Sequence, residues 1–330
     1  MVFAPRVWET LYRPIGAERG NRQKMEYQKT LKKEISLTGI GLHSGEKVTL
    51  RLNPAPVSSG IVFKRVDLSP AVEITAEAKN VVDTTLATVL GKGGATVSTV
   101  EHCLAALYGM GVDNALVEVD GPEIPILDGS AHDYVRAIAR SGLVEQSGAR
   151  KIIRVEKPIR IEDGDKFSIL RPFDGFRITY SIDFNEGFPG EQHYMMDVNP
   201  GNFADRLCRA RTFGFVRDVE LLKKIGKARG ASLENAVALD QGKVLNPEGL
   251  RMPDELVRHK MLDAVGDLAL AGCRIQGHLI VHKGGHELHR RLVGALLDRT
   301  DAWTAVTAQK SWERRRSAFR AIAAAAYAHA

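Results

Sequence analysis

The pattern of apolar and polar residues predicts strands at the start of the chain and a helix soon after. Apolar and polar residues alternate over 31–37, 47–52 and 61–66, which indicates strands with one buried face. The glycines of TGIGLHSG lead into one of these strands and not into a helix, which excludes a dinucleotide-binding loop. GKGG at 91–94 joins two strand-like runs, as in a hairpin. From 98 to 111 the apolar period becomes that of an amphipathic helix.

The second half of the chain repeats this pattern after an interruption near residues 146–150. SGEKVTLRLNP resembles DGDKFSILRP, and the helical segments VEHCLAAL and VRHKMLDA each place a histidine two residues after a valine. A duplicated unit predicts an α+β fold with two similar domains, 25–148 and 149–309, each a β-sheet packed on helices. A pseudo-twofold axis would then bring His102 and His259 together, with the active site between the domains.

Three segments fall outside this repeat. Residues 213–240 have the pattern of a strand, a short helix and a returning strand, which predicts a βαβ insertion in the second domain. Residues 1–24 have no sustained period and are interpreted as a disordered or non-native extension, with Met25 as a plausible start. We interpret 310–330 as a helical or frayed tail, and a basic membrane-surface contact is the alternative.

Composition adds limits on the class of protein. The 330 residues include 46 basic and 40 acidic residues, and this net charge of +6 is too small and dispersed to indicate nucleic acid. An anionic small substrate fits it equally well. The three cysteines form no CxxC pair, so neither a disulfide framework nor a structural zinc site is indicated. With no apolar run near the ~18 residues of a membrane span, we expect a cytoplasmic protein without stable membrane insertion.

The segment DELVRHKMLDAVGDL predicts a helix between Pro253 and Gly272. Residues four apart share a helix face, so His259, Asp263 and Asp267 form a polar stripe roughly opposite the apolar one. A histidine and an aspartate at this spacing reach one metal ion. A solvated helix surface is the ordinary alternative for such a pair.

The earlier helix contributes Glu101 and His102. His102, His259 and Asp263 would give three protein ligands and leave a fourth position for water, as in catalytic zinc sites. Glu101 would then serve as the general base that removes a proton from that water. The alternatives are a capping box between Ser98 and Glu101, and an ordinary core or surface role for His102.

Two further residues are candidates for chemistry. His286 follows an apolar strand, so we predict that it lies on a loop at the strand end. When protonated it could supply a proton to a leaving group, with Asp267 as the partner that keeps it charged. An exposed loop histidine is the alternative. Lys260, expected to point away from the ligand positions, could contact a phosphate, although such lysines are usually solvated.

Several motifs together resemble the UDP-3-O-acyl-N-acetylglucosamine deacetylase family, the zinc amidases of lipid A synthesis. They are TGIGLHSG, STVEH, PEIPILDGSA, RARTFGF, VRHKMLDAVGDL and KGGH, in the expected order over residues 26–305. One departure is Leu256, which stands where the family motif has phenylalanine. The resemblance implies two domains of similar α+β topology with the site between them.

The resemblance also implies a role for each site residue. These are His102, His259 and Asp263 as Zn²⁺ ligands, Glu101 as general base, His286 supported by Asp267 as general acid, Thr212 at the oxyanion, Lys260 at the UDP diphosphate, and Phe213 and Phe215 at the start of an acyl-chain passage.

The predicted reaction is zinc-dependent hydrolysis of the N-acetyl group of UDP-3-O-acyl-N-acetylglucosamine. Its products are UDP-3-O-acyl-glucosamine and acetate, in an early step of lipid A biosynthesis. We expect a monomer whose partner is this UDP-linked, acylated amino sugar and not nucleic acid. One rival is a zinc amidohydrolase of another substrate. The other is a non-enzymatic nucleic-acid-binding α+β module, which would hold no stoichiometric zinc.

Overall fold

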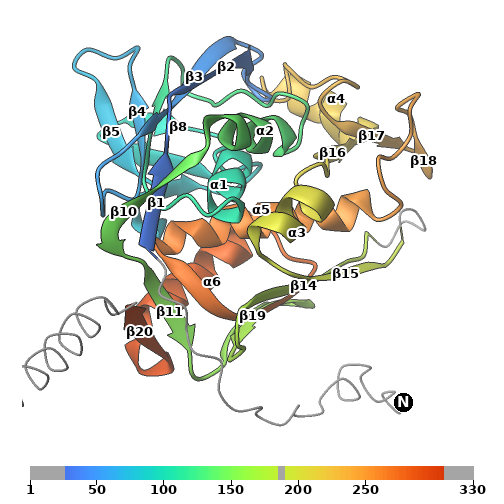
Figure 1. Ribbon diagram of the computed structural model, residues 1–330. Coiled ribbons are helices and arrows are strands. Elements are labelled where there is room, and N and C mark those ends of the chain that lie inside the picture. Colours follow the sequence, from blue (N-terminus) through green and yellow to red (C-terminus); the bar gives the residue numbers. More distant parts are fainter. Residues whose placement is uncertain (1–26, 185–189, 308–330) are drawn as a thin grey trace, which may run out of the picture. The chain divides into compact units, whose positions relative to one another are not determined.

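The computed structural model describes residues 27–184 and 190–307, and all of them belong to one compact unit, Glu26–Gln309 (Figure 1). The fold mixes helices with several sheets, as the predicted α+β class requires. The expectations for residues 1–24 and 310–330 lie outside the described residues. Within the described ranges no helix has the length and apolar character needed to cross a membrane.

The first large sheet is built from the strands that the opening pattern predicted. Its order is β2-β3-β9-β4-β5, with β2 at Ile35–Ile40, β3 at Lys47–Pro54, β9 at Ala115–Val119, β4 at Ile61–Arg65 and β5 at Val72–Thr75. Strand β9 pairs antiparallel with β3 and parallel with β4. Val48, Leu50 and Leu52 are buried while the residues between them are not, because successive side chains of a strand point to opposite faces.

The second large sheet has seven strands. They are β12 at Ile159–Asp163, β13 at Lys166–Arg171, β19 at Arg274–His282, β11 at Lys151–Val155, β20 at Trp303–Thr307, β14 at Phe176–Ile182 and β15 at Gln192–Asp197. Strand β19 pairs antiparallel with β13 and parallel with both β14 and β11. Strand β15 pairs antiparallel with β14.

Three small sheets complete the β structure. They are β1 at Tyr27–Leu31 with β10 at Leu143–Ala149; β6 at Val81–Asp83, β7 at Val89–Lys92 and β8 at Ala95–Val97; and β16 at Phe213–Phe215, β17 at Val237–Asp240 and β18 at Lys243–Val244. The predicted GKGG hairpin joins β7 to β8, with Gly93 and Gly94 at positive φ. Strands β16 and β17 pair parallel, with a helix between them, which is the predicted strand–helix–strand arrangement.

The helices are α1 at Glu101–Gly109, α2 at His132–Ser141, α3 at Pro200–Asn202, α4 at Val216–Lys224, α5 at Glu255–Leu268 and α6 at His286–Asp298. Short helical turns lie at Ala78–Asn80, Phe203–Leu207, Ala269–Ala271 and Thr300–Ala302. As predicted, the α5 segment begins after Asp254 and its last turn ends at Gly272, which adopts a left-handed conformation.

Helices α1 and α5 pack directly against each other (Figure 1). Every residue of α1 is buried, and so are both the apolar and the polar stripe of α5. The alternative of a solvated polar stripe on α5 is therefore wrong. His259, Asp263 and Asp267 are buried because α1 and α6 both pack against α5.

Candidate metal centre

A buried ion pair anchors the start of α5. The Glu255 carboxylate accepts hydrogen bonds from Nε of Arg211 at 2.8 Å and from the Arg211 backbone N–H at 3.0 Å. Both side chains are almost inaccessible to solvent. Because Arg211 directly precedes Thr212 and Phe213, this pair fixes the segment carrying those residues to the helix that carries His259.

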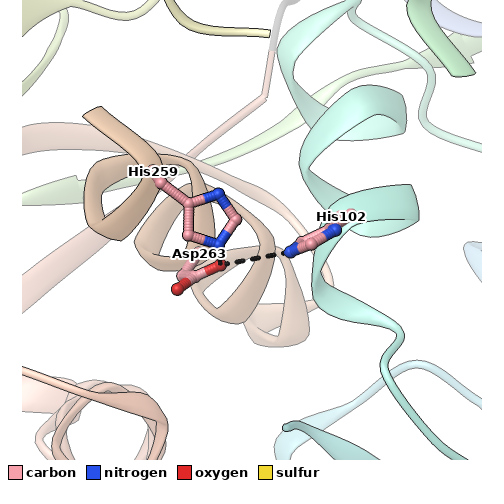
Figure 2. Close-up of side chains that lie close together, drawn as sticks. All are labelled: His102, His259 and Asp263. Carbon is pink, nitrogen blue, oxygen red and sulfur yellow. Dashed lines mark ion pairs between the residues drawn. The ribbon is translucent and has the colours of Figure 1, made fainter. Parts of the chain in front are cut away.

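Three polar side chains from α1 and α5 converge on one point (Figure 2). Oδ1 of Asp263 lies 3.3 Å from Nε2 of His259 and 3.5 Å from Nε2 of His102. Nδ1 of His259 lies 3.1 Å from the carbonyl oxygen of Ala210, which fits an Nδ1–H donor and directs Nε2 toward the cluster. The predicted proximity of His102 and His259 is confirmed, since their ring centroids are 4.9 Å apart.

The cluster fits a divalent metal ion. Oδ1 of Asp263, the oxygen that faces both histidines, is buried without a hydrogen-bond partner, although buried polar atoms are normally paired. Burial lowers the pKa of His259 to about 3, which leaves a neutral imidazole with a lone pair. Burial alone would raise the pKa of Asp263, but the ammonium group of Lys260, 2.7 Å from Oδ2, helps to hold it well below its usual range, so Asp263 is a carboxylate. Two imidazoles and a carboxylate are a donor set that zinc accepts.

Glu101, the first residue of α1, points into the same site. Its Oε2 accepts a hydrogen bond from the backbone N–H of Thr88 at 3.1 Å. Ser98 instead bonds the hydroxyl of Thr99, so the capping-box alternative is wrong. The physical reason is that the Glu101 side chain is buried in the site and not turned back along the helix end. Burial raises the pKa of Glu101, toward the range that suits a general base.

His286 and Asp267 form an ion pair, as the sequence predicted. Nδ1 of His286 lies 2.8 Å from Oδ2 of Asp267. Burial by itself would lower the pKa of His286, but the charge and hydrogen bond of Asp267 outweigh it and raise the pKa to about 9. The predicted loop position is wrong, since His286 is the first residue of α6. Its Nε2 lies 3.8 Å from Oε1 of Glu101.

Sequence reasoning missed two further partners of Asp267. Nδ1 of the buried His289 lies 2.8 Å from Oδ2, and the Thr88 hydroxyl donates to Oδ1 at 2.5 Å. His289 could have been noticed, because it stands three residues after His286 on the same helix. Thr88 lies in a strand-like run and carries no signal of its own.

A cavity of about 490 Å³ opens beside the cluster. Its apolar lining includes Leu86, Ile182, Phe184 and Phe213, and its polar lining includes Thr212, Lys260, Lys283 and His43. Lys260 does not point away from the ligands as expected, because its Nζ lies 2.7 Å from Oδ2 of Asp263. Phe215 is not part of this lining, but its ring packs against Phe184 with centroids 5.6 Å apart.

Converging imidazole and carboxylate ligands beside a carboxylate–histidine pair define the class as a candidate metal-dependent hydrolase. The sequence comparisons identify the family. A sequence model described as "LpxC: UDP-3-O-acyl N-acetylglycosamine deacetylase" matches residues 28–298. The chain therefore belongs to the UDP-3-O-acyl N-acetylglycosamine deacetylase family.

Relatives with curated names match most of the chain. A UDP-3-O-acyl-N-acetylglucosamine deacetylase of Shewanella piezotolerans is 52% identical over 289 residues, which cover 87% of this chain and 94% of the relative. A protein of the same name from Shewanella loihica is 51% identical over 292 residues, covering 88% and 95%. This family membership favours an enzyme over a nucleic-acid-binding module.

Proposed function

We propose that this protein hydrolyses the N-acetyl group of UDP-3-O-acyl-N-acetylglucosamine, releasing acetate and the free amine in an early step of lipid A biosynthesis. The names of its relatives give the substrate. The observation that carries the proposal is that Glu101 and the His286–Asp267 pair lie beside the three-ligand cluster. An amide hydrolase needs such a site, with one group to accept a proton and another to donate one.

We propose that the metal is Zn²⁺, held by His102, His259 and Asp263. The buried, unpartnered Oδ1 of Asp263 and the neutral His259 imidazole support this assignment. A zinc ion bound there polarises a carbonyl group and lowers the pKa of water. Two histidines and one carboxylate leave a fourth position for the reacting groups.

Different side chains of this protein carry out the successive proton transfers of the reaction. Glu101 removes the proton of the attacking water, and its burial-raised pKa makes it a stronger base than an exposed glutamate. Thr212, which lines the cavity, stabilises the oxyanion of the tetrahedral intermediate. His286, kept protonated by Asp267, donates a proton to the departing amine nitrogen. The C–N bond breaks as that nitrogen is protonated.

The cavity offers regions suited to the two ends of the substrate. Lys260 lies on its polar lining, where an ammonium group could bind the UDP diphosphate. Phe213 lies on the apolar lining, and Phe184 packs edge-on against both Phe213 and Phe215. We assign this aromatic group to the fatty acyl chain, because a hydrocarbon chain needs an apolar surface close to the reacting centre.

We also propose that the chain is an internal duplication of two domains, 25–148 and 149–309, with the site between them. The strand pairings β2-β3-β9-β4-β5 and β12-β13-β19-β14-β15 support it, since corresponding pairs run in the same sense. Helix α1 precedes β9 as α5 precedes β19, so His102 and His259 occupy corresponding helices.

Turnover of the named substrate tests the function. Purified protein is incubated with UDP-3-O-acyl-N-acetylglucosamine, and mass spectrometry follows the loss of the acetyl group. We expect acetate in equal amount, and no turnover after chelation until zinc is restored. Absence of turnover by the zinc-loaded protein would reject this substrate. A zinc amidohydrolase of another substrate would then be the remaining hypothesis.

A further inference from the structure

Thr88 contacts both Glu101, the proposed base, and Asp267, the partner of the proposed acid His286. Neither the sequence nor the family motifs indicated this residue. Thr88 lies between β6 and β7 and is 1% exposed. Its hydroxyl donates to Oδ1 of Asp267 at 2.5 Å, and its backbone N–H donates to Oε2 of Glu101 at 3.1 Å. Its carbonyl oxygen accepts the N–H of Val100, just before α1. Thr88 therefore joins the start of α1 to the far end of the polar stripe on α5.

The hydroxyl of Thr88 determines how the Asp267 carboxylate is oriented. Oδ2 accepts hydrogen bonds from the Nδ1 atoms of His286 and His289, each at 2.8 Å. The Thr88 hydroxyl holds the other oxygen, so the carboxylate plane is fixed from both sides. Because Asp267 is buried, bulk water does not readily replace a lost donor at Oδ1.

The backbone N–H of Thr88 acts in the same way on Glu101. It binds Oε2, and the other oxygen, Oε1, lies 3.8 Å from Nε2 of His286. Thr88 thus binds the oxygen of Glu101 that is not the one near His286 Nε2, and the oxygen of Asp267 that is not the one bonded to His286. Small displacements of positioned groups reduce rates strongly, because proton transfer requires close to hydrogen-bond distance.

We propose that Thr88 is a positioning residue that holds Glu101 and the Asp267–His286 pair in their relative orientation. This inference rests on the proposed function of the site. It predicts that loss of the hydroxyl lowers the rate of the chemical step and leaves substrate binding nearly unchanged, since Thr88 acts through the other residues and does not hold the metal.

The test compares three substitutions at Thr88 with one control. Thr88→Val replaces the hydroxyl with a methyl group, Thr88→Ala removes it without adding bulk, and Thr88→Ser retains it. Thr85→Val is the matched control, because Thr85 lies in the same segment but its exposed hydroxyl bonds only the neighbouring Asp83 among the contacts described. For each protein we would measure kcat, KM, bound metal and Tm.

We expect kcat to fall about 10- to 100-fold in Thr88→Val and Thr88→Ala, with KM and metal content close to wild type. Thr88→Ser and Thr85→Val should keep a kcat near that of wild type. A wild-type kcat in folded Thr88→Ala would overturn the proposal. A loss of bound metal would also overturn it, and so would an equal fall in kcat in Thr88→Ser, because either result would indicate a merely structural role.

A crystal structure of Thr88→Ala gives a readout that needs no substrate. We expect the Asp267 carboxylate to rotate, so that its contact with His286 lengthens. An unmoved carboxylate would overturn the proposal even if kcat had fallen. If instead the wild-type protein shows no turnover while Asp267 does rotate in the variant, the assigned reaction fails and the positioning contact stands.

Discussion

Gly266 and Glu101 are in direct backbone contact across the α1–α5 interface. A Cβ added to Gly266 would lie 2.0 Å from the carbonyl oxygen of Glu101 and 2.8 Å from its carbonyl carbon. No side chain fits at that distance. The absence of a Cβ at Gly266 therefore lets α1 approach α5 closely enough for His102 to reach the cluster formed with His259 and Asp263.

Gly266→Ala is expected to destabilise the protein by about 1–3 kcal/mol, because the two helices must separate to admit the methyl group. The displacement should also weaken metal binding, since His102 lies on α1 and the other two ligands, His259 and Asp263, lie on α5. Urea unfolding and metal titration measure the two effects. Gly294→Ala on α6 is the control, because its Cβ would meet nothing within 4 Å. Equal stability of the two variants would contradict the packing argument.

His259→Ala and Asp263→Ala are each expected to lose bound metal together with activity, because each removes one of three protein ligands. Glu101→Gln is the comparison, because it removes the base and leaves all three ligands. It should retain metal while kcat falls about 10²- to 10⁴-fold. Elemental analysis of the purified variants measures the bound metal. Full zinc occupancy in either ligand variant would show that the ligand assignment is wrong.

Asp267→Asn is expected to lower the pKa of His286. Burial lowers this pKa, and the Asp267 carboxylate is the main group that raises it to about 9. Without that charge the pKa should fall well below 9, although Glu101 and Asp263 still raise it. An NMR titration of the His286 ring in metal-free protein measures the shift. Retention of a pKa near 9 in the variant would assign the shift to other groups.

The same pair makes stability depend on pH. A histidine whose pKa is raised on folding stabilises the folded state fully below its unfolded pKa of about 6.5. This contribution is lost as the pH rises through the folded value of about 9. In metal-free protein, the difference in unfolding free energy between wild type and Asp267→Asn should therefore shrink between these two pH values. A difference independent of pH would count against the ion pair.

Phe215→Asp is expected to reduce kcat/KM for the acylated substrate at least tenfold, because loss of an apolar contact in a hydrophobic pocket has about this effect. Its ring packs against Phe184, which lines the cavity, so a charge there would disturb the surface assigned to the acyl chain. Met195→Asp on β15 is the control, since Met195 is 59% exposed. Unchanged kinetics would reject the acyl assignment, and a collapse of Tm would place Phe215 in the core.

The sequence by itself determined features that depend on local geometry. Helical periodicity placed His259, Asp263 and Asp267 on one face of a helix between Pro253 and Gly272, and strand alternation identified the buried face of β3. The two matching helices also led to the correct expectation that His102 and His259 meet. The spacing of residues along a regular element determines such relations before any long-range contact forms.

Only the tertiary structure decided which way these faces point. The polar stripe of α5 is buried because α1 and α6 pack against that helix, and Glu101 turns away from Ser98 because its carboxylate binds Thr88. Neither contact follows from residue spacing. Thr88 and Asp267 are 179 positions apart in sequence, and their hydrogen bond exists because packing of the helices brings these distant segments to the same buried site.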